Sequence, residues 1–178
     1  MQDKLRVSFL LTQDAKDITE SQIVRDENGI VTSVGVDFIP TKGTAFSAGY
    51  DLKACIPDTI VILPTEVVRI PTGICLNLFD SIQHGVDYNL PTGFIYPRSG
   101  LGTRGLVLAN TVGVIDPDYR GELIVMAFNR SEDVITVKTG DRIAQLVIGM
   151  SINSEFFQVE AFPFTTERDA NGFGSTGE

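Results

Sequence analysis

GELIVMAFN, residues 121–129, is a short apolar run that follows the turn-forming stretch DPDYR. Similar runs recur at a spacing of roughly ten residues, each bounded by glycine, proline, asparagine or aspartate. Helical spacing of apolar residues, at i, i+3 and i+4, does not persist for more than a turn or two. The runs therefore predict an all-β sandwich or barrel. The other runs span residues 29–39, 59–64, 66–78, 93–97, 105–115, 133–141, 142–150 and 155–162.

Four stretches differ from these runs. SGLGT, residues 99–103, follows a proline and predicts a short helix. ITESQIVRDENG, residues 18–29, fits either a helix or an extended excursion. Residues 80–92 are polar and lack alternation, so we expect a long loop. TTERDANGFGSTGE, residues 165–178, is charged and glycine-rich, and we expect a flexible tail outside the packed domain.

Composition limits the kind of ligand that the chain can bind. Its 178 residues, 43% of them hydrophobic, suffice for one domain with a core. The formal net charge of -9 repels a phosphate backbone, which argues against stable binding to nucleic acid. An anionic ligand would need a local cluster of donors or a divalent cation.

Cysteine content and the N-terminal sequence indicate the compartment. Cys55 and Cys75 are the only cysteines, too few for a disulfide framework or a zinc site, and we expect two buried free thiols. The N-terminal stretch MQDKLRVSFLLTQDAKD does not resemble a signal peptide. No segment is apolar over the ~18 residues that a spanning helix needs. These features predict a cytoplasmic protein without a membrane partner.

Hydrolytic chemistry in this chain would need a carboxylate as its base. The only histidine, His84, lies in the loop-like segment, which removes Ser-His and Cys-His pairs. Asp116, within GVIDPDYRGEL at residues 113–123, follows an apolar run and enters a turn. A hairpin of this kind can hold a carboxylate at its mouth, although the same residues also fit a plain turn.

YPRSGLG, residues 96–102, carries groups suited to phosphate. The guanidinium of Arg98 can form paired hydrogen bonds with phosphate oxygens. Ser99 and the free backbone amides from Gly100 onward can form an anion-binding turn. Taken alone, this short motif is weak support for a phosphate site.

Two further segments place polar side chains in apolar surroundings. AGYDLKA, residues 48–54, puts Asp51 in an expected strand, where a carboxylate needs a partner or a metal. GDRIAQLVI, residues 140–148, puts Gln145 among apolar residues, where an amide often only satisfies backbone groups. Each segment alone is also compatible with a structural role.

Taken together, AGYDLKA, YPRSGLG, NTVGVIDPDYRGEL, GDRIAQLVI and RDANGFGSTG resemble, in order, the five motifs of the homotrimeric dUTPase family, the deoxyuridine triphosphate nucleotidohydrolases. The resemblance implies a jelly-roll-like β-barrel of the dUTPase-like β-clip type. It also implies hydrolysis of dUTP to dUMP and pyrophosphate, which limits uracil incorporation into DNA and supplies dUMP for thymidylate synthesis. A homotrimer with sites shared between subunits is a further implication.

The resemblance assigns the nucleoside end of the substrate to the third motif. Asp116 matches the carboxylate that activates the attacking water, and is therefore the expected general base. Tyr119 matches the ring that packs against the deoxyribose and excludes a 2'-hydroxyl. Asn110 matches a side chain of the uracil slot. Backbone groups complete that slot, and they belong to Gly113, Val114, Ile115 and Ile124.

The resemblance assigns the phosphate end to the other upstream motifs. Arg98, Ser99 and Gly100 match the segment that binds the phosphates, and Gln145 matches an amide that also reaches them. Asp51 matches the acid that holds Mg²⁺ through a coordinated water, while the phosphates are the direct metal ligands. The cation and Arg98 would together neutralise the triphosphate in an acidic protein.

The glycine-rich end matches a mobile lid. The resemblance divides the chain into a β-barrel domain, residues 1–166, and a lid, residues 167–178, that closes over a neighbouring subunit's site. Phe173 would stack on uracil. The phosphates would be contacted by Arg168, Gly174, Ser175 and Thr176. Asp169 and Asn171 stand where the family has glycines, and we expect them to weaken or slow closure.

Two alternatives remain open from the sequence. The dCTP deaminase family shares the fold, but Met126 stands where its glutamate is expected and Tyr119 where it tends to have tryptophan. The segments 18–36 and 80–92 are longer than the compact family form needs. They are either neutral insertions or surfaces for an extra protein partner, in which case nucleotide occupancy would regulate that partner.

Overall fold

The computed structural model describes residues 7–21, 24–25, 31–33, 35–79 and 89–170. His84 and the expected lid residues Phe173, Gly174, Ser175 and Thr176 lie outside these ranges. The elements are β1 (Ser8–Leu11), α1 (Gln13–Ser21), β2 (Val24–Arg25), β3 (Val31–Ser33), β4 (Tyr50–Lys53), β5 (Ile60–Ile62), β6 (Val67–Asn77), β7 (Asn89–Pro97), α2 (Ser99–Thr103), β8 (Leu106–Leu108), β9 (Gly113–Ile115), β10 (Glu122–Asn129), β11 (Ile135–Val137) and β12 (Arg142–Ile152).

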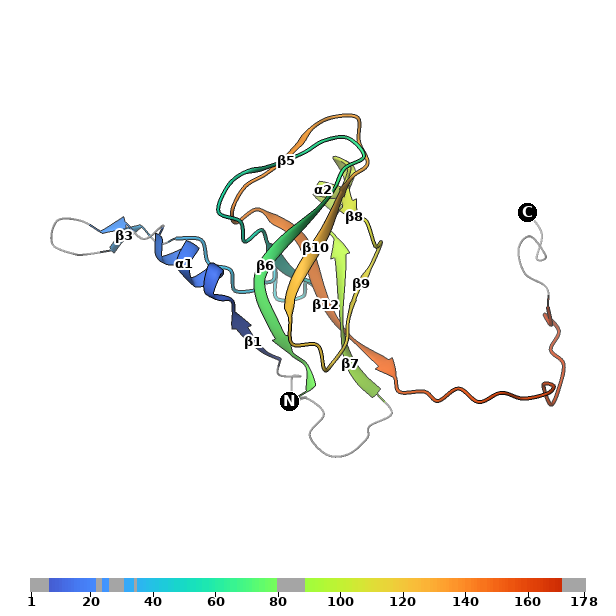
Figure 1. The fold of residues 1–178 in the computed structure, drawn as a ribbon. Coiled ribbons are helices and arrows are strands. Elements are labelled where there is room, and N and C mark those ends of the chain that lie inside the picture. Colours follow the sequence, from blue (N-terminus) through green and yellow to red (C-terminus); the bar gives the residue numbers. More distant parts are fainter. Residues whose placement is uncertain (1–6, 22–23, 26–30, 34, 80–88, 171–178) are drawn as a thin grey trace.

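Two four-stranded antiparallel sheets form the body of the molecule (Figure 1). The first sheet has the order β1-β6-β10-β8, and the second has the order β4-β12-β7-β9. Two small sheets, β11-β5 and β2-β3, are separate from them. The all-β prediction is confirmed. Because the described pairings leave each sheet open, closure into a barrel stays a prediction.

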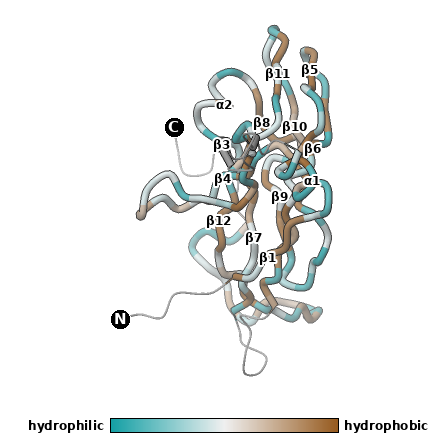
Figure 2. Tube along the Cα trace, turned by 90° about the vertical axis from the view of Figure 1, so that its left-hand side faces the viewer, coloured by the Kyte–Doolittle hydropathy of each residue, from teal (hydrophilic) through white to brown (hydrophobic). Residues whose placement is uncertain are grey.

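Burial along β10 shows why these runs form strands. Successive residues of β10 alternate between partly exposed and buried, which is the period of two that a half-buried strand requires. Leu123 and Val125 pack in one cluster with Ile95 of β7 and Leu146 of β12. The core thus combines residues of both sheets. In Figure 2 the strands are brown over much of their length and many connecting loops are teal.

The N-terminal elements attach to the first sheet through a bulge in β6. Gly73 has φ +73°, a conformation that favours glycine, and its amide donates to Glu122 Oε1 at 2.6 Å. Its carbonyl accepts from the amide of Thr12 at 2.9 Å. Ala15 of α1 is fully buried against this point. Within the stretch 18–29, residues 18–21 form the end of α1 and residues 24–25 form β2. Of the two predicted conformations, helix and extended chain, the stretch thus contains both.

Three expectations about local structure need correction. Residues 89–92 belong to β7 and not to a loop, because they pair with the end of β12. Residues 113–124 do not form a two-stranded hairpin, since β9 pairs with β7 whereas β10 pairs with β6 and β8. Residues 155–162 form no strand among the described residues.

Residues 153–170, called the C-terminal arm below, are exposed throughout. The arm leaves β12 and runs away from both sheets (Figure 1). Its exposed fractions are 97% for Phe156, 82% for Phe157, 86% for Phe162 and 76% for Phe164. Residues 165–170 are exposed and lie apart from both sheets, and the division into a domain and a lid stays a prediction.

Cys55 and Cys75 are free thiols, as expected, although Cys75 is only partly buried. No described helix has the length and apolar character that crossing a membrane would require. The structure describes parts of both long segments, 18–36 and 80–92. Binding of a protein partner by these segments stays a prediction.

Candidate active site

A pocket of about 380 Å³ lies where β4, β7 and β12 come together. Five of the predicted phosphate-binding and metal-holding residues line it: Asp51, Arg98, Ser99, Gly100 and Gln145. The remaining lining residues are Gly43, Ser47, Gly49 and Arg142. The structure therefore brings the first, second and fourth motifs into one pocket.

Strand pairing explains this convergence. Asp51 of β4 lies opposite Gln145 of β12, and Gln145 lies opposite Tyr96 of β7. Two residues after Tyr96 the strand gives way to α2, with Arg98 in an extended conformation just before the helix. The carbonyl of Arg98 accepts the amide of Gly102 at 2.8 Å, which fixes this turn. Three segments far apart in the chain thus lie on adjacent strands.

Two arginines bracket the Asp51 carboxylate. Arg98 Nε donates to Oδ1 at 2.8 Å, and Arg142 Nη1 donates to Oδ2 at 3.3 Å. The side chain of Asp51 is 13% exposed, against 28% for Arg98 and 55% for Arg142. Arg98 also donates to the backbone carbonyl of Arg142 at 3.3 Å. The carboxylate holds both guanidinium groups at the pocket, where they can face an anion.

Gln145 is fixed by contacts on both sides. Its Nε2 donates to the carbonyl of Pro97 at 2.9 Å. A methyl group added at Gly49 would lie 2.6 Å from Gln145 Oε1, so only glycine allows this close approach. Gly100, by contrast, faces open space, and its backbone is accessible from the pocket side. The amide of Gln145 is therefore held in place, while the Ser99–Gly100 turn is open to a ligand.

Asp116 lies at the end of β9, at the start of a turn that crosses from one sheet to the other. The amide of Tyr119 donates to the carbonyl of Asp116 at 3.1 Å, which closes the turn. Tyr119 is 43% exposed, and its hydroxyl donates to the carbonyl of Glu122 at 3.0 Å. The Asp116 side chain is exposed. Carboxylate and tyrosine ring thus stand on the same tight turn, open to solvent.

The expected uracil slot surrounds the start of β9. Asn110 is exposed, and its side-chain nitrogen lies 3.6 Å from the position that a Cβ on Gly113 would take. Gly113 is buried against Ile95, whereas Val114 is 59% exposed. Ile124 is partly exposed on β10. Asn110 and Gly113 are close neighbours, and their role in a uracil slot stays a prediction.

Asp51 and Asp116 lie at opposite edges of one sheet. In the order β4-β12-β7-β9, Asp51 is on one edge strand and Ile115, next to Asp116, is on the other. Three strand spacings of ~4.8 Å separate these edges. Neither Asp116 nor Tyr119 lines the pocket of Arg98. Within one chain, the residues of the Arg98 pocket and the turn of Asp116 therefore lie apart from each other.

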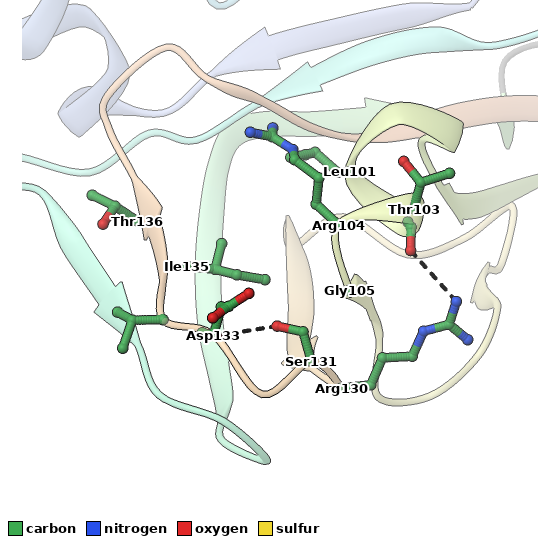
Figure 3. Close-up of a pocket in the computed structure, with 11 residues that line it drawn as sticks. Leu101, Thr103, Arg104, Gly105, Arg130, Ser131, Asp133, Ile135 and Thr136 are labelled. Atoms are coloured by element: carbon green, nitrogen blue, oxygen red, sulfur yellow. Dashed lines mark hydrogen bonds between the residues drawn. The ribbon is translucent and has the colours of Figure 1, made fainter.

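A larger pocket, of about 680 Å³, lies elsewhere (Figure 3). It is lined by α2 and by the connection from β10 to β11, and it contains none of the predicted site residues. Arg130 Nη2 donates to the carbonyl of Gly102 at 3.4 Å, and Ser131 Oγ donates to the carbonyl of Asp133 at 3.1 Å. The volume of a pocket therefore does not by itself identify the active site.

Arg142 is a site residue that the sequence interpretation missed. It precedes Gln145 by three residues in the same motif, GDRIAQLVI. Its positive charge, close in sequence to a candidate phosphate-binding amide, is the signal by which the sequence could have identified it. Arg168, on the C-terminal arm, is exposed and lies outside this pocket.

Comparison with known proteins agrees with this geometry. A family model described as dUTPase matches residues 38–177. The deoxyuridine 5'-triphosphate nucleotidohydrolase of Hydrogenovibrio crunogenus is 46% identical over 140 residues, which cover 78% of this chain and 86% of that protein. The corresponding protein of Acinetobacter baylyi is 44% identical over 141 residues, 79% of this chain and 88% of that protein.

Solved structures show the same fold. The dUTPase of Staphylococcus bacteriophage 80alpha with dUpNHpp has a TM-score of 0.72 at 24% identity and covers 98% of this chain and 100% of its own. A point mutant of the dUTPase from phage phi11 of S. aureus, described with a structural Mg(II) ion, has a TM-score of 0.62 at 21% identity and covers 89% of this chain and 99% of its own. With the match of the family model over 38–177, these likenesses show that the chain belongs to the dUTPase family.

Proposed function

We propose that the chain hydrolyses dUTP to dUMP and pyrophosphate. The oxygen of a water molecule forms a bond to the α-phosphorus, the bond from that phosphorus to the α-β bridging oxygen breaks, and a water proton passes to a carboxylate. The pocket in which Asp51 holds two arginines carries this proposal, because a chain of net charge -9 needs such a local concentration of cations to bind a triphosphate.

The phosphate end would bind in the pocket of Arg98. Arg98 and Arg142 supply paired donors, while Ser99, the Gly100 backbone and Gln145 add neutral ones. These groups would stabilise the charge that develops on the departing pyrophosphate. Because the carboxylate and Pro97 already fix Arg98 and Gln145, the donors need little reorganisation when substrate binds.

Mg²⁺ fits this pocket as an ion held mainly by substrate. Among the described residues, no three histidine, cysteine or acidic side chains come together as a ligand group. Asp51 is the only carboxylate that lines the pocket, and its oxygens also accept from the two arginines. This donor set suits Mg²⁺, which keeps several waters and binds phosphates with one or two carboxylates. When bound, the ion would neutralise phosphate charge, and Asp51 would accept from one of its waters.

The nucleoside end would bind on the turn after β9. Asp116 is the proposed general base, since its exposed carboxylate can accept a proton from a bound water. Asn110 and the β9 backbone would pair with uracil, and Tyr119 would pack on the deoxyribose. The backbone groups in question belong to Gly113, Val114, Ile115 and Ile124.

We propose a homotrimer in which one copy supplies the phosphate pocket and another the turn of Asp116. The separation of the Arg98 pocket from Asp116 within one chain supports this arrangement, because a second copy can bring them together. The phenylalanines of the C-terminal arm also need a surface to cover them. Residues 1–166 would be the enzymatic domain and residues 167–178 the lid. Arg168, Phe173, Gly174, Ser175 and Thr176 would close over the nucleotide of a neighbouring copy.

A mixing experiment tests the shared site. R98A and D116N variants should each be nearly inactive, because each lacks one half of every site. When the two variants are unfolded, mixed in equal amounts and refolded, about one quarter of the sites should combine two intact halves. Recovery of about 25% of the wild-type activity supports shared sites. No recovery in correctly refolded mixed trimers would contradict them.

A nucleotide panel tests the reaction itself. Pyrophosphate release from dUTP, dTTP, dCTP and UTP is measured with and without Mg²⁺. We expect release from dUTP with Mg²⁺ and little from the others, and deamination of dCTP is not expected. The D116N variant should bind dUTP without turning it over, since the amide keeps the shape of the carboxylate and loses its basicity. No turnover of dUTP by folded wild-type protein would reject the proposal. We expect the protein to act in the cytoplasm.

A further inference from the structure

One large side chain next to the phosphate pocket has no role in the proposed reaction. Phe46 is 98% exposed, more than any other large hydrophobic residue that the structure describes. It sits on a turn in which the amide of Ser47 donates to the carbonyl of Thr44 at 3.1 Å and the amide of Thr44 donates to Ser47 Oγ at 3.0 Å. The loop is thus braced by its own hydrogen bonds while it presents an aromatic ring to solvent.

Phe46 belongs to a loop that lines the pocket. Gly43 and Ser47, on either side of Phe46 in the chain, both line the pocket that contains Asp51 and Arg98. A phenyl ring has no donor for phosphate, so its contribution there must be an apolar contact. Covering it would remove a large apolar surface from water.

The C-terminal arm has the chemistry to cover this ring. The arm carries exposed phenylalanines and four acidic residues against one arginine: Glu155, Glu160, Glu167, Asp169 and Arg168. The pocket carries two cations, Arg98 and Arg142, around Asp51. The arm and the pocket region thus each present an exposed phenylalanine, and the acidic arm complements the cations of the pocket.

The position of Arg168 selects one phenylalanine of the arm. This step rests on the proposed function, in which Arg168 of a neighbouring copy reaches the phosphates. Phe164 precedes Arg168 by four residues, which span at most about 14 Å of extended chain. Phe157 precedes it by eleven residues, which reach up to about 38 Å. Phe164 is therefore held within about 14 Å of Arg168, whereas Phe157 can lie much farther from it.

We propose that Phe46 is a docking contact for the C-terminal arm of a neighbouring copy and that it packs against Phe164. The braced turn keeps the ring in place before the arm arrives. Docking at this point positions the lid that follows Arg168. Phe46 is thus a positioning residue for lid closure and does not touch the reacting atoms.

A crosslinking experiment tests the contact without reference to activity. Under mild oxidation, the full-length F46C/F164C variant should form covalently linked chains on a denaturing gel. The F46C/F157C variant is the matched control, and the two single variants F46C and F164C account for the native thiols. Linked chains confined to F46C/F164C support the inference. Equal linkage in F46C/F157C, or none in F46C/F164C, overturns it.

Kinetics provide the second test. F46A and F164A should each lower kcat/KM for dUTP about two- to tenfold, the range that an aromatic pair contributes. The F46A/F164A double variant should be no worse than the more impaired single variant, because both changes remove the same contact. F79A, which replaces an exposed phenylalanine away from the pocket, should match wild type.

The outcomes separate this inference from the proposed function. If wild-type protein hydrolyses dUTP while F46A matches wild type, the docking contact is wrong and the enzyme proposal stands. If F46A and F164A lower kcat/KM by independent factors, the pairing is also wrong. Failure of wild-type protein to hydrolyse dUTP rejects the proposed function, and the crosslinking result then decides the docking contact alone.

Discussion

Replacement of Arg142 by alanine should lower catalytic activity strongly and stability only slightly. The Arg142 side chain is 55% exposed and its bond to Asp51 is long, at 3.3 Å, so R142A should cost less than about 1 kcal/mol of unfolding free energy. Arg98 is 28% exposed and bonds the same carboxylate at 2.8 Å. R98A should therefore cost about 1.5–3 kcal/mol, as expected for a charge-assisted hydrogen bond.

The effect of R142A on turnover should be much larger than its effect on stability. A guanidinium that contacts the triphosphate contributes about 1.5–3 kcal/mol, so kcat/KM should fall roughly 10- to 100-fold. Pyrophosphate release measures activity, and urea unfolding measures stability. The R142K control keeps the charge without the paired donors and should fall between wild type and R142A. A kcat/KM for R142A within twofold of wild type, or a loss of stability as large as for R98A, would refute this reasoning.

Three more predictions concern packing and protonation. G49A should lower kcat/KM about tenfold without unfolding the protein, because the added methyl group displaces Gln145, and G102A, where the added group meets no atom, is the control measured in the same assay. G73A should lower the unfolding free energy by about 2–3 kcal/mol in urea titrations, since its φ is +73° and its Cβ would lie 2.6 Å from that of Ala15. Burial, with smaller contributions from neighbouring carboxylates, raises the pKa of the Cys55 thiol from 9.0 to about 11. The folded protein then keeps a proton that the unfolded chain releases, so stability should fall by up to about 3 kcal/mol between pH 9 and pH 11, and C55S should lack this component.

The sequence pattern predicts a helix or strand correctly where residues close by in the chain determine the conformation. The apolar run that forms β10 is visible in the sequence, and α2 covers Ser99–Thr103 as predicted. β7 shows the opposite case. Its first residues, 89–92, include a proline and two polar residues, and they form a strand only because β12 continues to Ile152 and pairs with them. That pairing joins residues too far apart in sequence for local pattern to indicate it.

The candidate site divides in the same way. Residue types and motif order identified Arg98, Gln145 and Asp51, and the structure places all three in one pocket. The pairing of Asp51 with two arginines was not predictable, since these partners lie 47 and 91 residues away in sequence. The separation of Asp116 from the pocket residues could not be predicted either, because it follows from the strand order of the sheet and not from spacing in the chain.

The C-terminal arm shows why strand-like composition need not give a strand. EFFQVEAF, residues 155–162, has the composition of a strand, but strand formation requires a partner for its backbone groups, and β12 ends at Ile152. A surface on a second copy can supply that partner. Burial of four arm phenylalanines would contribute about 6–12 kcal/mol per arm to association. A chain that ends at Ile152 should therefore associate far more weakly in sedimentation equilibrium than one that ends at Ala170, which keeps the whole arm. Equal association of the two truncated chains would show that the trimer does not depend on the arm, and the strand-like composition of residues 155–162 would then need another cause.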